Sequence, residues 1–327
     1  MKFLSIVIPH YTETERVIFP LLSSISNQLG VDWKEIEVII ANDGGAYPLG
    51  EDFLGMFEMP VRQISLDENR GPGVTRQAGI DAARGEYVMF CDADDMLFSA
   101  TVLDALTGLA RNGHADYIVS HWVEEVKKES GTFGYQKRSP YGIWMHGKLF
   151  LRSFLTRDHI RFDSQLRSSE DGYFITLASI LAERTAELTP SVITYVWKWR
   201  DESLVRRNRD DFRRSAAFTH VKAFSKAFCE LEQRGLPDSR IMGNVLQFIT
   251  GWYFELHTPF WRNSADRDEL EQLFARCAQP IWHYYLDAPS EAITRIYAEE
   301  RQRVFEGHME EEPFSMWLYR LGLPKRG

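Results

Sequence analysis

The chain has few cysteines, no long hydrophobic run and no excess of basic charge. Its three cysteines are Cys91, Cys229 and Cys277, and no two of them form a Cys-x-x-Cys pair. This scarcity argues for a reducing compartment and against a structural zinc site. The net charge is −9, and residues 1–100 account for all of it, with 7 Lys and Arg against 16 Asp and Glu. Such an acidic part is a poor surface for nucleic acid, but it suits a divalent cation.

Membrane-spanning and targeting segments are also missing from the pattern. The longest apolar stretch without a charge, residues 241–254, is too short to span a bilayer. The opening MKFLSIVIPHY has too short an apolar run for a signal peptide, and it predicts a first strand instead. We therefore expect a cytoplasmic protein without a transmembrane segment.

Short apolar runs alternate with helical patterns over the first 120 residues. The candidate strands are 3–8, 37–41, 61–65, 87–91 and 116–120, and the candidate helices are 17–29, 73–83 and 101–111. This alternation predicts an α/β fold, with a mostly parallel sheet covered by helices on both faces. From about residue 210 the apolar residues recur at helical spacing. We therefore expect two domains, residues 1–209 and a helical C-terminal domain of residues 210–327.

Three carboxylates, Asp92, Asp94 and Asp95, come directly after the apolar run 87–91. They are expected where that strand leaves the sheet, at the edge where open α/β sheets bind ligands. Oxygen ligands at such an edge suit Mg²⁺ or Mn²⁺ carrying a substrate diphosphate. A solvated acidic turn has the same short pattern, so the surrounding segments must decide between the two.

Several of those segments come in the order found in one enzyme family. They are Ser5-Ile-Val-Ile-Pro-His-Tyr11, Val38-Ile-Ile-Ala-Asn-Asp-Gly44, Asn69-Arg-Gly71, Arg76-Gln-Ala-Gly79 and Gly85-Glu-Tyr87, which lead into Asp92-Ala-Asp94-Asp95. Residues 3–205 thus resemble a family 2 glycosyltransferase, which has the Rossmann-like GT-A fold. The resemblance implies transfer of a sugar from a nucleotide-diphosphate sugar, most often a UDP-sugar in this family, to an acceptor hydroxyl.

The resemblance also assigns a donor site. Its nucleotide-binding residues would be Pro9, Tyr11, Glu13, Asp43, Arg76 and Asp92, and its metal ligands for Mn²⁺ or Mg²⁺ would be Asp94 and Asp92. Asp43 would accept the N–H of the base, Tyr11 would stack on the base, and Arg76 would lie near the diphosphate. Without the resemblance, Asp43 belongs to a turn and Arg76 to the exposed face of a helix. Thr12 and Asn42 depart from the family pattern and leave the choice of nucleotide open.

A second acidic site, Ser168-Ser-Glu-Asp-Gly172, follows the segment Gly147-Lys-Leu-Phe-Leu-Arg152. The resemblance implies that Asp171 is the general base, that Glu170 supports it, and that one in-line displacement inverts the anomeric carbon. A carboxylate is suited to this role because a sugar hydroxyl must lose its proton as it attacks. The alternative is helix capping, since serine and acidic residues are favoured at a helix start.

Four further residues are weaker candidates for an acceptor or diphosphate loop: Trp144, His146, Ser203 and Arg206. Core packing would equally explain the two rings, and a solvated helix face would explain residues 206–214. The Gln-x-x-Arg-Trp pattern of processive synthases is absent, which favours addition of single sugars. The C-terminal domain would bind the acceptor, form an oligomer or support the catalytic domain. Its aromatic tail, residues 313–321, would contact a membrane or partner, or pack onto its own domain.

Two other functions compete with this interpretation. A sugar nucleotidyltransferase would carry a glycine-rich loop near its N-terminus, whereas residues 1–20 contain no glycine. A nucleotide-sugar-binding module without catalysis would have no chemical need to keep both Asp94 and Asp171.

Overall fold

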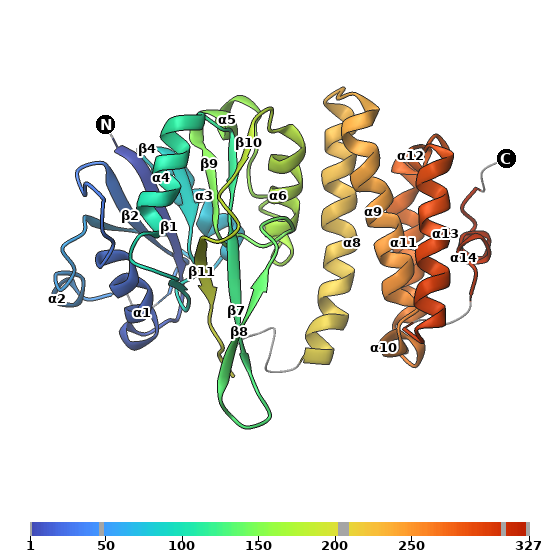
Figure 1. Ribbon diagram of the computed structural model, residues 1–327, viewed down its shortest axis with the longest axis horizontal. Helices are drawn as coiled ribbons and strands as arrows, with labels where there is room; N and C mark the ends of the chain where they lie inside the picture. The colour runs from blue at the N-terminus through green and yellow to red at the C-terminus, as the bar shows by residue number, and fades with distance from the viewer. Residues whose placement is uncertain (1, 46–48, 202–208, 309–311, 325–327) are drawn as a thin grey trace. The chain divides into compact units, whose positions relative to one another are not determined.

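The computed structural model describes residues 2–45, 49–201, 209–308 and 312–324. The chain divides into two compact units, Met1–Arg207 and Asn208–Gly327. The first combines strands and helices, and the second is helical (Figure 1). None of the helices within the described ranges has the length and apolar character that a membrane crossing requires.

A seven-stranded sheet forms the centre of the first unit. Its order is β10 (Thr185–Glu187), β6 (Tyr117–Val119), β9 (Lys148–Leu151), β4 (Gly85–Phe90), β1 (Lys2–His10), β2 (Ile36–Asn42) and β3 (Val61–Ser65). Strands β4, β1, β2 and β3 are parallel, while β9 is antiparallel to both of its neighbours. The predicted mixed, mostly parallel sheet is confirmed.

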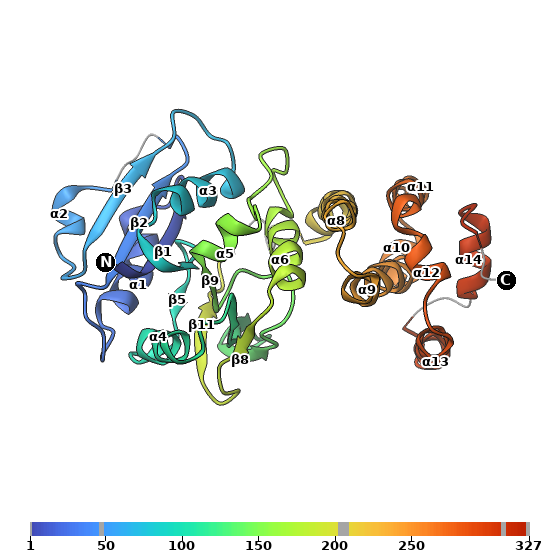
Figure 2. The same cartoon turned by 90° about the horizontal axis from the view of Figure 1, so that it is seen from above.

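Helices cover both faces of this sheet (Figure 2). Successive side chains of a strand point to opposite faces, and the central strands are apolar at nearly every position, so both faces need cover. Ile6 and Ile8 belong to a core that includes buried residues of α1 (Glu15–Ser26) and α4 (Val102–Gly113). Val7 instead meets Gly79 of α3 (Pro72–Ala82). An added Cβ at Gly79 would lie 2.2 Å from Val7 Cγ1, so α3 packs closely on the sheet.

The first unit also contains a four-stranded sheet and three further helices. The sheet order is β5 (Met96–Leu97), β11 (Ile193–Trp197), β7 (His121–Lys127) and β8 (Phe133–Arg138). The helices are α2 (Glu51–Leu54), α5 (Arg152–Arg157) and α6 (Glu170–Leu181). Strand β5 begins directly after the acidic cluster, so the small sheet holds one side of that cluster.

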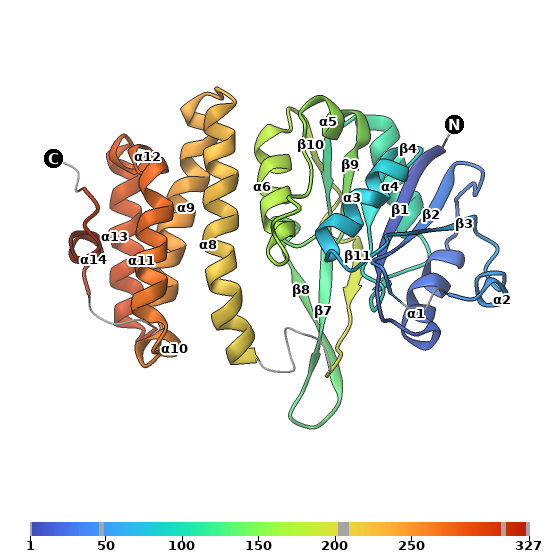
Figure 3. The same cartoon turned by 180° about the vertical axis from the view of Figure 1, so that it is seen from behind.

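The second unit consists of helices (Figure 3), and aromatic side chains are prominent among its buried residues. Its helices are α8 (Arg209–Gln233), α9 (Asp238–Leu256), α10 (Pro259–Arg262), α11 (Arg267–Ala278), α12 (His283–Leu286), α13 (Ser290–Phe305) and α14 (Phe314–Arg320), with a 3₁₀ turn at Gln279–Ile281. Phe314 and Trp317 of the tail are buried, and Trp317 Nε1 donates to Glu271 Oε1 at 3.2 Å. The tail therefore packs onto its own unit.

Candidate active site

The ends of three neighbouring strands bring the predicted donor residues to one edge of the sheet. Strands β4, β1 and β2 are parallel and adjacent, and they are followed by Asp92, Tyr11 and Asp43 respectively. The chain order reverses at β1, since β2 and β3 lie on one side of it and β4 on the other. Such a reversal is where α/β sheets bind nucleotides.

Asp43 fixes the loop that precedes α3. Its Oδ1 accepts the backbone N–H of Arg70 at 2.7 Å, and its Oδ2 accepts that of Gly71 at 2.9 Å. Gly71 has a φ of 89°, which a residue with a side chain rarely adopts. An ionised carboxylate keeps acceptor capacity beyond two hydrogen bonds. Contact between Asp43 and a nucleobase therefore stays a prediction that this geometry permits.

Tyr11 and Glu13 lie in the turn after β1, and Pro9 lies near the end of that strand. Tyr11 is an exposed residue, with 43% of its surface accessible. Glu13 shapes the turn, because its Oε2 accepts the Tyr11 backbone N–H at 2.9 Å. Pro9 is half-buried within β1. The stacking role predicted for Tyr11 is compatible with this exposure and is not tested by it.

Arg76 is buried and joins the two acidic sites. Its Nη2 lies 2.7 Å from Asp92 Oδ1, and its Nη1 lies 2.9 Å from Glu170 Oε1. Burial alone would lower the pKa of Arg76, but the two carboxylates raise it above its ordinary value. With 6% of the residue exposed, the alternative of a surface position for Arg76 is wrong.

Glu170 and Asp171 begin α6 behind a strained residue. Ser169 has a φ of 61°, and its side chain, which lies within the described ranges, makes no capping hydrogen bond to the helix. Glu170 and Asp171 nevertheless lie in the first turn, where acidic side chains favour a helix start, so a helix-start role for the acidic pair is compatible with the structure. Burial raises the pKa of Asp171, although Arg76 opposes the shift. Burial and the neighbouring Asp171 raise the pKa of Glu170 to about 7, again against Arg76.

Tyr195 of β11 organises the acidic cluster after β4. Its hydroxyl accepts the Asp92 backbone N–H at 2.9 Å and donates to Asp95 Oδ2 at 2.8 Å. The backbone N–H of Lys198 donates to Asp95 Oδ1 at 2.9 Å. Burial, followed by Asp94 and Asp92, raises the pKa of Asp95 well above its ordinary value. This network is more ordered than a solvated turn would be.

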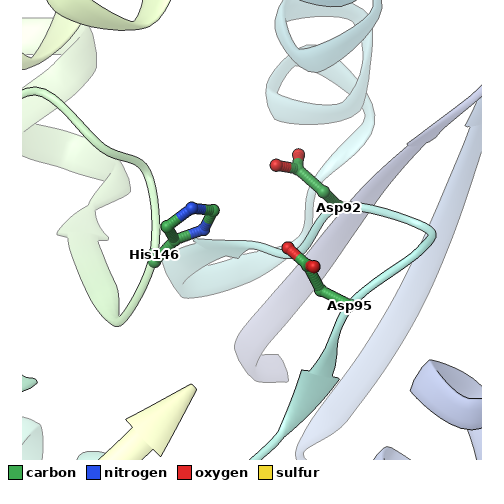
Figure 4. Close-up of side chains that lie close together, drawn as sticks. All are labelled: Asp92, Asp95 and His146. Atoms are coloured by element: carbon green, nitrogen blue, oxygen red, sulfur yellow. The ribbon is translucent and has the colours of Figure 1, made fainter. Parts of the chain in front are cut away.

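His146 faces this cluster from a separate segment (Figure 4). One ligand atom from each of Asp92, Asp95 and His146 lies within 4.8 Å of the other two. The imidazole stacks on Tyr195 with ring centroids 4.7 Å apart. Burial lowers the pKa of His146 to about 4, so the ring is neutral at pH 7 and can ligate a metal. Two carboxylates and an imidazole are a donor set that fits Mn²⁺.

Two other described candidates, Asp94 and Trp144, do not belong to the cluster of Asp92, Asp95 and His146. Asp94, predicted as a metal ligand beside Asp92, has its Oδ2 2.9 Å from Arg200 Nη1. Trp144 is 37% exposed, and its ring lies parallel to His146 with centroids 6.1 Å apart. Ser203 and Arg206 lie outside the described residues.

Sequence reasoning included Asp95 in the acidic cluster but did not name it as a metal ligand, and it assigned no role to Tyr195, Lys148 or Arg200. Lys148 is buried at the start of β9, where its Nζ donates to the Pro140 carbonyl at 2.9 Å. Burial lowers the pKa of Lys148 to about 7, and the charge of Asp171 opposes this shift. A lysine inside a strand of otherwise apolar residues is the one signal that would have identified it.

The raised pKa of Glu170 has a consequence for stability. Since its folded pKa of about 7 exceeds the ordinary 4.5, the folded protein holds a proton that the unfolded chain releases between these values. Stability should therefore fall as pH rises from 4.5 to 7. We expect Glu170→Gln to remove this pH-dependent loss, so that the stability difference between the variant and wild type shifts in favour of the variant by up to about 3 kcal/mol between pH 4.5 and pH 8.

Urea unfolding of both proteins at several pH values measures this difference. Exposed Glu58 provides the control, because Glu58→Gln should leave the pH dependence unchanged. An identical decline in wild type and Glu170→Gln would show that Glu170 is not the group responsible.

Comparisons with known proteins agree with the geometry. A family model described as "Glycosyl transferase family 2" matches residues 5–168. The chain is 28% identical to the succinoglycan biosynthesis protein ExoO of Rhizobium meliloti, over 58% of this chain and 60% of that protein. It is 24% identical to the poly(ribitol-phosphate) beta-N-acetylglucosaminyltransferase TarS of Staphylococcus aureus, over 62% of this chain and 37% of TarS. Each match thus covers less than two thirds of the relative.

Solved structures share the fold. Residues 1–349 of S. aureus TarS in complex with UDP-GlcNAc align with a TM-score of 0.63 at 17% identity, covering 100% of this chain and 93% of that one. The mannosyltransferase PcManGT from Pyrobaculum calidifontis, in complex with GDP-Man and Mn²⁺, aligns with a TM-score of 0.51 at 15% identity, covering 98% and 84%. Because the family model matches just over half of the chain, the protein belongs to glycosyl transferase family 2.

Proposed function

We propose that this protein is a metal-dependent, inverting glycosyltransferase that moves one sugar from a UDP-sugar to an acceptor hydroxyl. The proposal rests mainly on Arg76, which links the candidate metal cluster to the candidate base region through Asp92 and Glu170. Donor diphosphate and acceptor must meet in such a reaction, and this network holds both carboxylate sites together.

The donor would lie along the carboxyl ends of β4, β1 and β2. Asp43 and Tyr11 would contact the base, Glu13 shapes the turn beside it, and Pro9 would line the same end of β1. The TarS complex with UDP-GlcNAc and the PcManGT complex with GDP-Man favour a nucleotide sugar. UDP is our choice because TarS, which is similar in both sequence and fold, binds it.

The residues that would hold Mn²⁺ or Mg²⁺ are Asp92, Asp95 and His146, with Asp94 as a further ligand. When bound, the metal supplies positive charge to the diphosphate of the leaving nucleotide. The protein supports the site with the Tyr195 hydroxyl, which orients both ends of the Asp92–Asp95 turn.

Asp171 would act as the base on the acceptor. The acceptor oxygen forms a bond to the anomeric carbon while the bond from that carbon to the diphosphate oxygen breaks. The hydroxyl proton passes to Asp171, and the electron pair of the broken bond leaves with UDP. Attack opposite the leaving group inverts the anomeric centre. Burial, which raises the pKa of Asp171, makes this carboxylate a stronger base than one in water.

Trp144 offers an exposed ring for the acceptor, and aromatic faces pack well on sugar rings. Contact with the diphosphate or the acceptor stays the role proposed for Ser203 and Arg206, which lie outside the described residues. The helical unit would bind the acceptor, form an oligomer or support the first unit. A peripheral membrane contact is compatible with the exposed Met316 and Tyr319.

A cytoplasmic location is proposed from the low cysteine content.

Release of UDP tests the function directly. The protein, with MnCl₂, is incubated with UDP-glucose, UDP-galactose, UDP-GlcNAc or GDP-mannose, alone and with a panel of glycan acceptors. We expect UDP release from a UDP-sugar, accelerated by one acceptor class. Binding of a UDP-sugar without release under any of these conditions would instead identify a binding module.

A further inference from the structure

Asp94 differs from Asp95 in the kind of partner that holds it, and from Asp92 in that its arginine is partly exposed, whereas Arg76 is buried. The Asp95 carboxylate is fixed by the Tyr195 hydroxyl and by the Lys198 backbone N–H. Asp94 is instead held by a cation, since Arg200 Nη1 donates to its Oδ2 at 2.9 Å. The Asp94 and Arg200 side chains are 31% and 30% exposed, so both have room to change rotamer.

The backbone around Arg200 is anchored. The segment 198–201 continues from β11, and the Lys198 N–H binds Asp95 Oδ1. The next N–H, that of Trp199, donates to Glu125 Oε2 at 2.9 Å. The guanidinium therefore stays within reach of the acidic cluster, while its long side chain can turn to a new partner nearby.

A divalent cation at the cluster changes the charge balance of this pair. A metal bound by Asp94 neutralises much of the charge of this carboxylate and so weakens its pair with Arg200, and the two cations repel each other at close range. The displaced guanidinium then needs another anion. Under the proposed function, the donor diphosphate arrives at the same place, and guanidinium groups bind phosphate oxygens in bidentate geometry.

We propose that Arg200 exchanges partners during donor binding: it neutralises Asp94 in the free protein and contacts the diphosphate in the complex. Arg200 thus disfavours metal binding alone and favours metal and nucleotide together. The two ligands become thermodynamically coupled, each raising the affinity for the other by the same factor. The second half of this inference rests on the proposed function.

Isothermal titration calorimetry separates the two halves. MnCl₂ is titrated into the free protein, and UDP is titrated with EDTA and with saturating MnCl₂. The variants are Arg200→Met, which removes the charge, and Arg200→Lys, which keeps it. Lys127→Met is the control. It breaks an exposed ion pair between Lys127 of β7 and Asp201, the residue that follows Arg200.

We expect Arg200→Met to bind Mn²⁺ alone about tenfold more tightly than wild type and to bind UDP with Mn²⁺ about tenfold more weakly. Arg200→Lys should lie between the two, and Lys127→Met should match wild type. Unchanged Mn²⁺ affinity in Arg200→Met would overturn the exchange at Asp94. Tighter Mn²⁺ binding with unchanged UDP affinity would overturn the diphosphate contact. If wild type binds no UDP at all, the proposed function fails, whereas equal UDP binding in wild type and Arg200→Met removes only this inference.

Discussion

Replacing Asp171 with asparagine should lower the rate of sugar transfer by about 10²–10⁴-fold, which is the usual contribution of a positioned base. Asparagine has nearly the same shape, so it can still accept the Gly172 backbone N–H that Asp171 Oδ1 binds at 2.7 Å. It cannot take a proton from the acceptor hydroxyl. UDP binding should stay unchanged, because Asp171 does not belong to the strand-end residues assigned to the nucleotide.

UDP release and UDP affinity, measured on the same preparation, check this expectation. Asp52→Asn is the matched control, because Asp52 is an exposed carboxylate on α2. Wild-type turnover in Asp171→Asn would exclude a base role for Asp171. Loss of turnover together with loss of UDP binding would point instead to a structural role for this carboxylate.

Removing Arg76 should have the largest effect on stability. In Arg76→Met the side chain keeps its length but leaves the Glu170 carboxylate, which is 8% exposed, and the Asp92 carboxylate without their cation. Breaking a buried ion pair on one side costs about 3–5 kcal/mol. The loss should shrink at low pH, where protonation relieves the unpaired carboxylates, and Glu170→Gln in the same chain should recover part of it.

Urea unfolding measures the free energies for this comparison. Arg161→Met is the control, because Arg161 forms an ion pair with Asp81 in which both side chains are more than half exposed. Surface pairs of that kind contribute about 0–1 kcal/mol. A similarly small cost for Arg76→Met would mean that the network joining the two acidic sites adds little to the folded state.

The strand ends were predictable because parallel neighbours leave a sheet at the same edge. The strands expected at 37–41, 61–65 and 87–91 are present as β2, β3 and β4 with bounds shifted by no more than two residues. Asp43 and Asp92 had therefore to approach each other once β1 lay between their strands. Apolar runs and the turns that follow them are local signals in the sequence. They were enough to place Asp43 and Asp92 at the same edge of the sheet.

The side-chain network was not predictable in the same way. Arg76 was open to a surface interpretation because its burial depends on α6, where Glu170 lies 94 positions further along the chain. The roles of Asp95 and Tyr195 depend on the four-stranded sheet. There β5 pairs with β11, and the two strands are also far apart in the sequence. Neighbouring aspartates carry no sequence signal that says which of them belong to the candidate metal cluster and which of them pair with an arginine.

Thermal unfolding with UDP, GDP, CDP and dTDP, each with and without Mn²⁺, tests the central claim most directly. A ligand at 100 times its dissociation constant should stabilise the folded protein by about 2.7 kcal/mol. We predict a rise in Tm with UDP that Mn²⁺ enlarges and that Asp92→Asn removes. No rise with any nucleotide, or a rise with UDP that is the same without Mn²⁺, would contradict a metal-assisted nucleotide-sugar site at the ends of β4, β1 and β2.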